Sequence, residues 1–455
     1  MLAGATLFGR RGSGVAVNLP LASLAGKVAG GLTYTRASGQ WHQDDAGVWQ
    51  YVAANVPAFN SKGILLEPPS TNKCTCYGVI PADSYAAAVT SGAVLVLGRK
   101  YEIVTRATTD FTTKGAANNA VGTQFVLTAA CTLGAGDSVK EVQFGVGTKS
   151  YHNGTSFVQN HTNMTLSGDT AAVLTTVDDT AALAAAGLSN LAASGKWYKI
   201  DNSAGAAAAY VTIAGSAGNL NPHSRSLFYL VDGAGCSVFM VADAASGMAL
   251  NVIGAVTRAI KDGYVSTSSG AFQISVVAGR TLRILLPQLE ELPFTTSPMP
   301  TAGATATRAA TVPSFNTAGL RTNNLSEKFT WTPAAASQGT RWLWGSYLDA
   351  NNYVGVLHDG TSLIFRKRIA GVNYDATKAL TYVAGTAYNI GFRLSANGGS
   401  DIFINSVKGT ANSNAASIVY GTTIKLGQDG NGGSLQAGGI KDFRIYSRVL
   451  VDGSF

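Results

Sequence analysis

The sequence has 455 residues, with 53 glycines, 12 prolines and only 13% charged residues, which favours several domains built from short strands and tight turns over long helices. The formal net charge of +8 is scattered, and its densest run is Arg366, Lys367 and Arg368. Alternation along a strand would divide that run between two faces, so we expect no nucleic-acid partner.

Residues 1–30 are rich in Gly and Ala and are expected to form an extended arm that is flexible until it meets a partner. They lack the apolar core of a signal peptide, and no stretch approaches the roughly 18 apolar residues of a membrane span. The four cysteines are too few for a disulfide framework and are expected to be free thiols. These features predict assembly in a reducing cytosol without membrane insertion.

Residues 32–72 are expected to form a strand, a hairpin and a second strand that ends in a proline pair. The turn is placed at residues 44–47, where Asp and Gly tolerate the backbone that a turn requires. Trp41, Trp49 and Tyr51 flank this turn. Two interpretations are open, because such rings are either a platform for a sugar or cross-strand pairs that stabilise the sheet.

Residues 82–144 contain alternating strands around glycine-marked turns and are predicted to be a small inserted β module. Residues 145–195 are a low-complexity connecting region, with one short helix expected at residues 178–186 and Asp178 or Asp179 near its N-cap.

Residues 31–81 and 196–300 are predicted to be the two parts of one discontinuous β-sandwich. Its last strand, RTLRILLPQLEEL, places Leu282 and Ile284 on one face, and Pro287 indicates an edge or an end. We expect Leu282 and Ile284 to share a core with residues 32–67. Residues 301–319 are small and flexible and are predicted to be a linker.

Residues 320–455 contain eight runs that resemble strands, separated by turn signals such as Asn397, Gly398 and Gly399. This domain also holds two polar turns with oxygen donors that suit a hard cation or a sugar. The same sequences are ordinary turn sequences, so both interpretations are open. The candidate ligand-binding residues of the domain are Tyr347, Asp349, Asn351, Asn352, Asp429 and Asn431.

Several of these segments resemble proteins of tailed bacteriophages. The motifs YTRAS, AANVPAF, GILLEPPSTN and LPQLEELPFTTSPMPTAGATATRAA resemble a module of tail-fibre and other virion-appendage proteins, and TTDFTTKGAANNAVGTQFVLT is similar to a small module inserted in phage tail proteins. The order of the C-terminal strands resembles a laminin-G-like or concanavalin-like jelly roll. The resemblance implies an arm that attaches to the particle, a homotrimer, and rim loops that bind Ca²⁺ or glycans.

No catalytic signature accompanies these motifs. Glu290 and Glu291 are adjacent and would face opposite sides of a strand, and no nucleophile elbow or phosphate-binding loop is present. We therefore expect an all-β, multi-domain, non-enzymatic protein without a required cofactor: a tail-fibre or head-fibre component of a virion that attaches to host-surface glycan. The alternatives are a capsid decoration or tail structural protein without host contact, and a tailspike that depolymerises polysaccharide.

Overall fold

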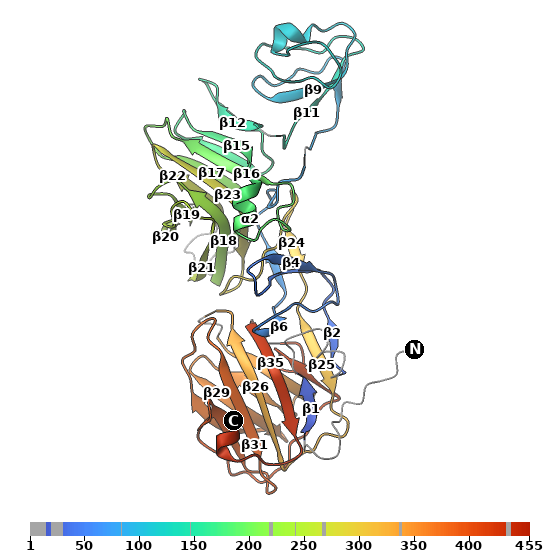
Figure 1. The fold of residues 1–455 in the computed structure, drawn as a ribbon, viewed down its shortest axis with the longest axis vertical. Helices are drawn as coiled ribbons and strands as arrows, with labels where there is room; N and C mark the ends of the chain where they lie inside the picture. Colours follow the sequence, from blue (N-terminus) through green and yellow to red (C-terminus); the bar gives the residue numbers. More distant parts are fainter. Residues whose placement is uncertain are drawn as a thin grey trace. The chain divides into compact units, whose positions relative to one another are not determined.

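The computed structural model describes residues 15–19, 31–82, 84–145, 147–217, 222–241, 243–265, 270–335, 339–433 and 438–455. The chain divides into two compact units, unit 1 (Met1–Ser70 and Thr307–Phe455) and unit 2 (Thr71–Ala306). Strands β7 (Ser70–Asn72) and β24 (Ala306–Arg308), where the chain passes between the units, form a two-stranded sheet. The regular secondary structure described in both units is almost entirely antiparallel strand, which confirms the predicted all-β, multi-domain fold (Figure 1).

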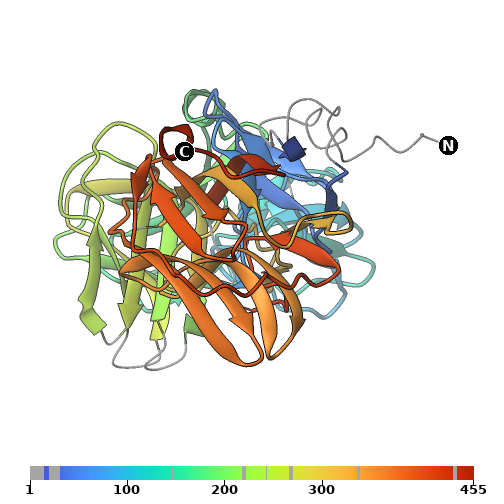
Figure 2. The same cartoon turned by 90° about the horizontal axis from the view of Figure 1, so that it is seen from below.

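Unit 1 is a sandwich of two antiparallel sheets, and Figure 2 shows its later strands in orange and red from a second direction. The described strands of the first sheet are β33 (Val407–Lys408), β32 (Ser400–Ile404), β31 (Tyr388–Leu394), β26 (Leu325–Pro333), β35 (Gly438–Tyr446), β6 (Gly63–Leu66), β5 (Phe59–Asn60) and β1 (Val15–Leu19). Those of the second are β2 (Thr33–Thr35), β25 (Val312–Asn316), β34 (Thr423–Leu426), β27 (Arg341–Asp349), β28 (Asn352–His358), β29 (Ser362–Ile369) and β30 (Val372–Ala379). A short hairpin, β3 (Gln40–Gln43) with β4 (Trp49–Val52), and the 3₁₀ helix η2 (Asp452–Ser454) complete the unit.

The core of unit 1 lies between its two sheets, where rings such as Trp344 and Phe443 meet edge to face. Lys367 also points into this interior and is fully buried, while Arg366 and Arg368 point outward, so the predicted division of the basic run is confirmed. The Lys367 ammonium donates hydrogen bonds to three main-chain carbonyl oxygens, those of Gly398, Asn414 and Ala416, at 2.6, 2.7 and 2.9 Å. Three acceptors match the three N–H groups of a protonated lysine, although burial lowers its pKa to about 8.

Unit 2 contains a second sandwich. The described strands of one sheet are β13 (Phe157–Val158), β12 (Lys149–His152), β15 (Val173–Asp178), β16 (Lys196–Asn202), β23 (Arg280–Glu290), β18 (Pro222–Val231) and β21 (Thr257–Val265). Those of the other are β14 (Met164–Gly168), β17 (Ala209–Ala217), β22 (Gly270–Val276), β19 (Ser237–Met240) and β20 (Asp243–Ala249). Helix α2 (Thr180–Ala185) begins after Asp179, whose carboxylate accepts from the amide of Ala182 at 3.0 Å, as the predicted N-cap requires.

The inserted module has a sheet and a core of its own within unit 2. Its described strands are β10 (Gln124–Val126), β9 (Lys100–Thr105), β11 (Ser138–Glu141) and β8 (Val89–Thr90), with the 3₁₀ helix η1 (Phe111–Lys114). Ile103, Phe111 and Phe125 pack in its centre. Asp137 is buried beside them and accepts hydrogen bonds from the amides of residues 107–109 and from the Thr108 hydroxyl.

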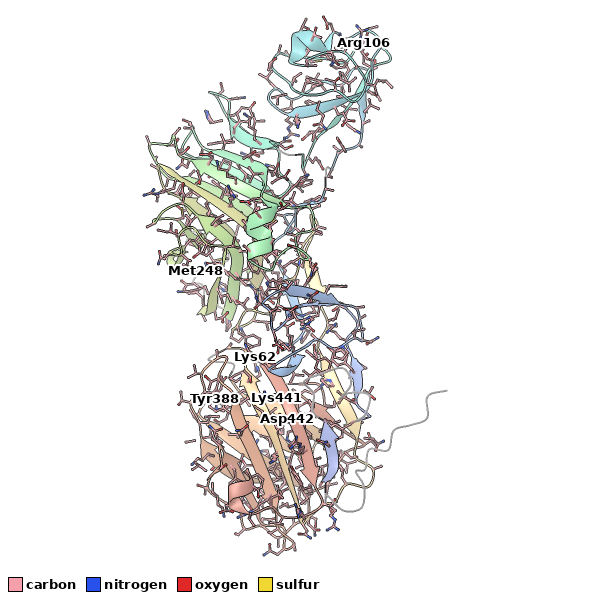
Figure 3. The ribbon with its side chains drawn as sticks, viewed as in Figure 1. Lys62, Arg106, Met248, Tyr388, Lys441 and Asp442 are labelled. Atoms are coloured by element: carbon pink, nitrogen blue, oxygen red, sulfur yellow. The ribbon has the colours of Figure 1, made fainter. Side chains whose placement is uncertain are left out.

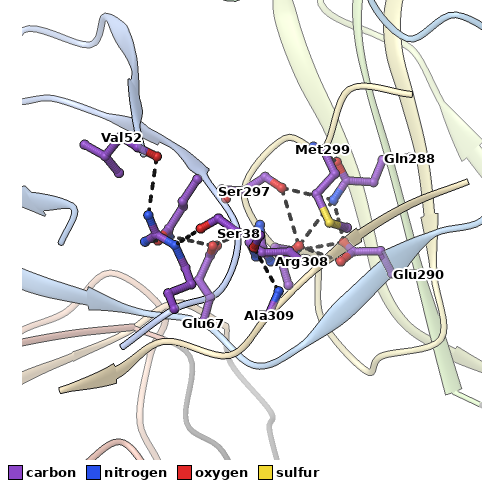
Figure 4. A network of polar contacts seen from close by, with 12 residues as sticks. Ser38, Val52, Glu67, Gln288, Glu290, Ser297, Met299, Arg308 and Ala309 are labelled. Carbon is purple, nitrogen blue, oxygen red and sulfur yellow. Dashed lines mark hydrogen bonds and ion pairs between the residues drawn. The ribbon is translucent and has the colours of Figure 1, made fainter. Parts of the chain in front are cut away.

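Three of the phage-like motifs meet in one buried polar network of unit 1 (Figure 4). Arg36 of YTRAS donates to the hydroxyl of Tyr34 at 2.6 Å and contacts the amide oxygen of Gln40. Gln40 donates to the carboxylate of Glu67, in GILLEPPSTN, at 2.7 Å, and the same carboxylate pairs with Arg308 of TATRAA at 3.0 Å. These side chains hold the β3–β4 hairpin and the motifs together, which is a structural role for Glu67.

Hydrogen bonds within unit 2 connect further residues of two of these motifs, GILLEPPSTN and LPQLEELPFTTSPMPTAGATATRAA. The side chain of Asn72 donates to the carbonyl oxygens of Pro287 and Met299 at 3.1 and 3.0 Å and accepts from the amide of Leu289 at 3.1 Å. Gln288 donates to Glu290 at 2.6 Å, and the Thr296 amide donates to the same carboxylate at 3.0 Å.

The structure differs from the expected domain map. Leu282 and Ile284 lie in the core of unit 2, whereas Tyr34, Ile64 and Leu66 lie in the core of unit 1. The physical reason is strand pairing, because β2 pairs with β25 and β6 pairs with β35. The two segments thus belong to different sandwiches.

Four smaller expectations also need correction. Within the expected linker, β25 forms part of a sheet and buries Phe315, and within the expected connecting region β12 to β15 belong to the sandwich of unit 2. Val15–Leu19 of the expected arm is a strand paired with β35, while residues 1–14 and 20–30 lie outside the described residues. Strand β23 is not an edge strand, because it pairs with β16 on one side and with β18 on the other. It tolerates Pro287 because this residue lies beyond the last pair with β16 and where the register with β18 shifts.

Candidate functional site

The outer face of one sheet of unit 1 carries most of the candidate residues. Strands β27, β28, β29 and β30 are consecutive antiparallel neighbours in it. Val354 and Phe365 point into the core between the sheets, so the alternate residues of their strands lie on the opposite, outer face. The register places one outward residue from each strand directly opposite the next, in the row Tyr347, Tyr353, Arg368 and Asn373.

Aromatic rings form the first half of this row. Tyr347 and Tyr353 are nearly parallel, with ring centroids 6.2 Å apart and planes at 15°, and both are partly exposed. The indole of Trp342 meets Tyr353 edge to face at 5.7 Å. The guanidinium carbon of Arg368 lies 5.7 Å from the centre of the Tyr353 ring, so a cation covers one side of the aromatic pair.

Charged and amide side chains form the second half. Arg366 binds Asp375 with two hydrogen bonds of 2.9 and 2.7 Å, and this hydrogen bonding raises the pKa of Arg366. Arg368 donates to the side-chain oxygen of Asn373 at 3.0 Å. The two guanidinium groups are therefore held in place while both residues keep partial exposure to solvent.

The turn after Tyr347 orders the next group of candidates. The Asp349 carboxylate accepts from the amide of Asn351 at 2.8 Å and from the side-chain amide of Asn352 at 3.0 Å. These hydrogen bonds, chiefly that from the Asn352 side chain, lower the pKa of Asp349. The carboxylate closes its own turn and stays ionised at neutral pH beside the tyrosine pair.

The loop of Asp429 lies against the same part of β27. Asp429 accepts from the amides of Asn431 and Gly433 at 2.8 and 2.9 Å. A Cβ atom added at Gly345 would come within 2.4 Å of the Asp429 main chain, so only glycine permits this approach. A Cβ atom added at Gly430 of the same loop would come within 2.8 Å of the amide nitrogen of Tyr347.

The structure thus brings the six C-terminal candidates to one region of unit 1. Sequence reasoning did not include Tyr353, Arg366, Arg368, Asn373 or Asp375 in this site. Strand alternation placed Arg366 and Arg368 on a shared face, but the sequence does not reveal that β28 lies between β27 and β29 with Tyr353 opposite Arg368.

Strand alternation alone would put Trp342 and Trp344 on one face, but the structure places them on different faces. A shift of register between them puts Trp344 in the core between the sheets, while Trp342 joins Leu357 and Ile364 in a separate apolar cluster. The Trp342 ring covers Gly355, where a Cβ atom would come within 2.8 Å of it.

The aromatic hairpin of β3 and β4, which carries the other three candidate residues, lies outside the sheet of Tyr347. Trp41 and Tyr51 are opposite each other with ring centroids 5.3 Å apart, and Tyr51 is 57% exposed, whereas Trp49 is buried. This geometry is a cross-strand pair with one exposed ring. The hairpin is its own two-stranded sheet and does not belong to the sheet of Tyr347.

Comparison with known proteins gives only distant similarity. No protein-family model and no curated protein sequence matches this chain. Part of the chain is similar to domain 4 of AbnA, a GH43 extracellular arabinanase from Geobacillus stearothermophilus, solved in complex with arabinotriose, at 19% identity and a TM-score of 0.28, covering 32% of this chain and 70% of that chain.

Two receptor-binding structures give similar values. The botulinum neurotoxin serotype D binding domain is 15% identical with a TM-score of 0.27, covering 31% of this chain and 38% of that chain. A structure described as a receptor binding domain is 12% identical with a TM-score of 0.26, covering 32% of this chain and 38% of that chain. The similarity therefore spans well under half of these two chains and concerns the fold alone.

The adjacent glutamates and the paired cysteines, which could have formed a catalytic or metal site, have structural roles. Glu290 is buried in the Gln288 network and Glu291 pairs with Lys73 at 3.4 Å, so these carboxylates do not act together. Cys74 and Cys76 are buried free thiols, and burial raises the pKa of both. Among the described residues no group of three or more His, Cys, Asp and Glu could hold a metal, and no helix is long and apolar enough to cross a membrane.

Proposed function

We propose that this chain is a non-catalytic attachment protein of a bacteriophage virion, a tail-fibre or head-fibre component assembled in the host cytoplasm. In this proposal unit 1 binds a host-surface glycan, and other virion proteins and a homotrimeric arrangement anchor the chain. The outward row Tyr347, Tyr353, Arg368 and Asn373 carries the glycan part of the proposal. Weak single sites gain avidity when a symmetric assembly presents several copies.

The chemistry of this row suits a sugar. Aromatic faces pack against the C–H groups of a sugar ring, and the guanidinium, amide and carboxylate groups beside them bind its hydroxyls. Arg366 and Arg368 are already oriented by Asp375 and Asn373, so binding would order few side chains. Asp349 and the Asp429 loop offer further hydrogen-bond partners at the same edge of the sheet.

The virion part of the proposal rests on the motif resemblance. The residues Arg36, Glu67 and Arg308, which come from three of the phage-like motifs, form one buried network. That common structural role is a physical reason for the three motifs to occur together in one sequence.

Replacing Tyr347 or Arg368 is expected to weaken glycan binding. The full-length protein should first be screened on an array of bacterial surface polysaccharides, and a polymer that binds should then be titrated against Tyr347→Ala and Arg368→Gln. Each change is expected to reduce affinity by about tenfold, because each removes a stacking or charge-assisted contact from the row.

Tyr51→Ala is the matched control, because it removes an exposed tyrosine from the separate β3–β4 hairpin. If Tyr51→Ala loses affinity and Tyr347→Ala does not, the glycan site lies on the hairpin instead. Absence of binding to every polysaccharide on the array would favour a decoration protein without host contact. Release of oligosaccharides from a bound polymer would contradict the non-catalytic part and favour a tailspike.

A further inference from the structure

The first sheet of unit 1 carries a small polar pocket on its outer face, apart from the residues of the tyrosine row. The pocket has a volume of about 280 Å³ and lies over β26, β31 and β35, with η2 at one end. This is just below the usual range for pockets of drug-sized ligands and suits a single sugar ring. Its main lining side chains are Lys328, Thr330, Asn389, Asp442, Arg444 and Phe455.

Aromatic packing forms one wall of the pocket. The ring of Phe455 stacks on Phe403 with centroids 4.2 Å apart and planes at 8°. It occupies the space above Gly391, where a Cβ atom would come within 2.1 Å of the ring, so only glycine leaves room for the ring at this position. The main-chain oxygen of Phe455 accepts from the hydroxyl of Ser406.

A β-bulge forms the opposite wall. Lys328 is opposite Arg444 and Thr330 is opposite Lys441, so β35 has one extra residue in this interval. Asp442 lies in the bulge with φ of 53°, a left-handed backbone that is uncommon for a residue other than glycine. Figure 3 shows Asp442 beside Lys441 on this strand. Bulges and strained residues of this kind concentrate at functional sites.

Positive charge exceeds negative charge among the lining side chains. Lys328 and Arg444 are cations, and Asp442 is the single carboxylate side chain among the described lining residues. The Lys328 ammonium donates to the carbonyl oxygen of Ser454 at 3.1 Å, which leaves further N–H donors. Arg444 donates through Nε to Asn18 at 3.1 Å and lies 3.7 Å from Asp442, too far for a normal hydrogen bond.

Neutral donors and acceptors complete the pocket. The Thr330 hydroxyl donates to the side-chain oxygen of Asn389 at 3.0 Å, which leaves the amide N–H groups of Asn389 for another partner. An anionic group would meet Lys328 and Arg444, and hydroxyls would meet Asn389 and Thr330. The Phe455 ring offers an apolar surface to the same ligand.

We propose that this pocket is a second binding site, independent of the tyrosine row, for an acidic sugar whose carboxylate or phosphate group lies between Lys328 and Arg444. The proposal rests on this pocket and not on the proposed function of the other sheet. Two cations from neighbouring strands supply the recognition of charge. The pocket volume limits the ligand to about one sugar ring.

The test uses the full-length protein and three small probes, namely glucuronate, glucose 6-phosphate and glucose, followed by saturation-transfer NMR. Glucuronate, glucose 6-phosphate or both are expected to bind, and glucose is expected to bind at least tenfold more weakly. The two charged probes distinguish a carboxylate from a phosphate ligand. Equal binding of glucose would overturn the proposal.

Variants assign the binding to the pocket. Lys328→Met and Arg444→Gln, which come from different strands, are each expected to weaken binding about tenfold. Asp442→Asn is expected to strengthen it several-fold, because it removes the carboxylate and asparagine tolerates the left-handed backbone. Lys62→Met, a change of an exposed lysine that does not line the pocket, is the matched control and should leave the affinity unchanged.

The opposite signs make the outcome decisive. Weaker binding by Asp442→Asn would contradict an anionic group bound beside that carboxylate, and an equal loss in Lys62→Met and Lys328→Met would show that general charge rather than the pocket binds the probe. The thermal unfolding of every variant shows whether a loss of binding comes from an unfolded protein or from a change in the pocket alone. If one of Lys328→Met and Arg444→Gln fails to fold, unchanged binding in the other still overturns the proposal.

Discussion

Asp137→Ala is expected to unfold the inserted module while the sandwich of unit 2 stays folded. Asp137 is buried and accepts hydrogen bonds from the amides of Ala107, Thr108 and Thr109 and from a threonine hydroxyl. Alanine would leave these donors without their acceptor, at a cost of more than about 3 kcal/mol. A module with one small core cannot compensate for that loss.

Hydrogen exchange with mass spectrometry measures this effect locally. Peptides from residues 100–141 should lose protection in Asp137→Ala, and peptides from β16 and β23 should keep it. The matched control is Asp110→Ala, which removes the exposed N-cap of η1 and should leave the protection of residues 100–141 largely unchanged. Unchanged protection in residues 100–141 would contradict the role given to Asp137.

The same carboxylate predicts a response to acid. Burial alone would raise the pKa of Asp137, but hydrogen bonds from the amides of Ala107 and Thr109 and from threonine hydroxyls lower it well below 3.8. The unfolded chain therefore binds this proton more readily than the folded chain. The stabilisation is complete above about pH 4 and is lost as the pH falls below that value, so the module should lose protection in that range.

Glu327→Gln is expected to stabilise unit 1 at neutral pH. Glu327 is 1% exposed in β26, and burial raises the pKa of its carboxyl well above 4.5. Its proton is held more tightly in the folded chain, so stability is complete below about pH 4.5 and decreases as the pH rises. At pH 7 the folded chain therefore holds a carboxyl group whose ionisation costs stability, and glutamine, which does not ionise, should remove that loss.

Urea unfolding followed by tryptophan fluorescence measures the change. The variant should gain stability at pH 7 and show a weaker dependence on pH between 5 and 8. Glu67→Gln is the matched control, because it makes the same chemical change at a carboxylate that pairs with buried Arg308 and should destabilise unit 1 by about 3 kcal/mol. Equal effects of the two substitutions would contradict the interpretation of Glu327.

Local features of the fold could be predicted from the sequence. The turn at Asp44 forms because its carboxylate accepts from the amides of Ala46 and Val48, and Asp179 caps α2 as its position before an alanine-rich run suggests. The division of Arg366 and Lys367 between two faces follows from strand alternation alone. Each of these features depends on residues that are close in the chain.

Features that depend on distant pairing could not be predicted in this way. Ile64 and Leu66 are apolar and alternate as any buried strand does, and nothing in their segment shows that Ile440 and Gly438 are their partners. For the same reason the sequence identified Tyr347 and Asp349 as candidates but not their neighbours Arg368 and Asn373. The bulge that separates Trp342 from Trp344 also has no signal in the sequence.

The pairing of β6 with β35 has a consequence for biosynthesis. Translation proceeds from the N-terminus, so the apolar strand Gly63–Leu66 leaves the ribosome before all of unit 2 and long before Gly438–Tyr446. Unit 2 is continuous and can fold as soon as its own residues have emerged. A nascent chain whose residues up to 306 have left the ribosome should therefore contain a folded unit 2 and an unpaired, aggregation-prone β6, which makes unit 1 the part that depends on chaperones.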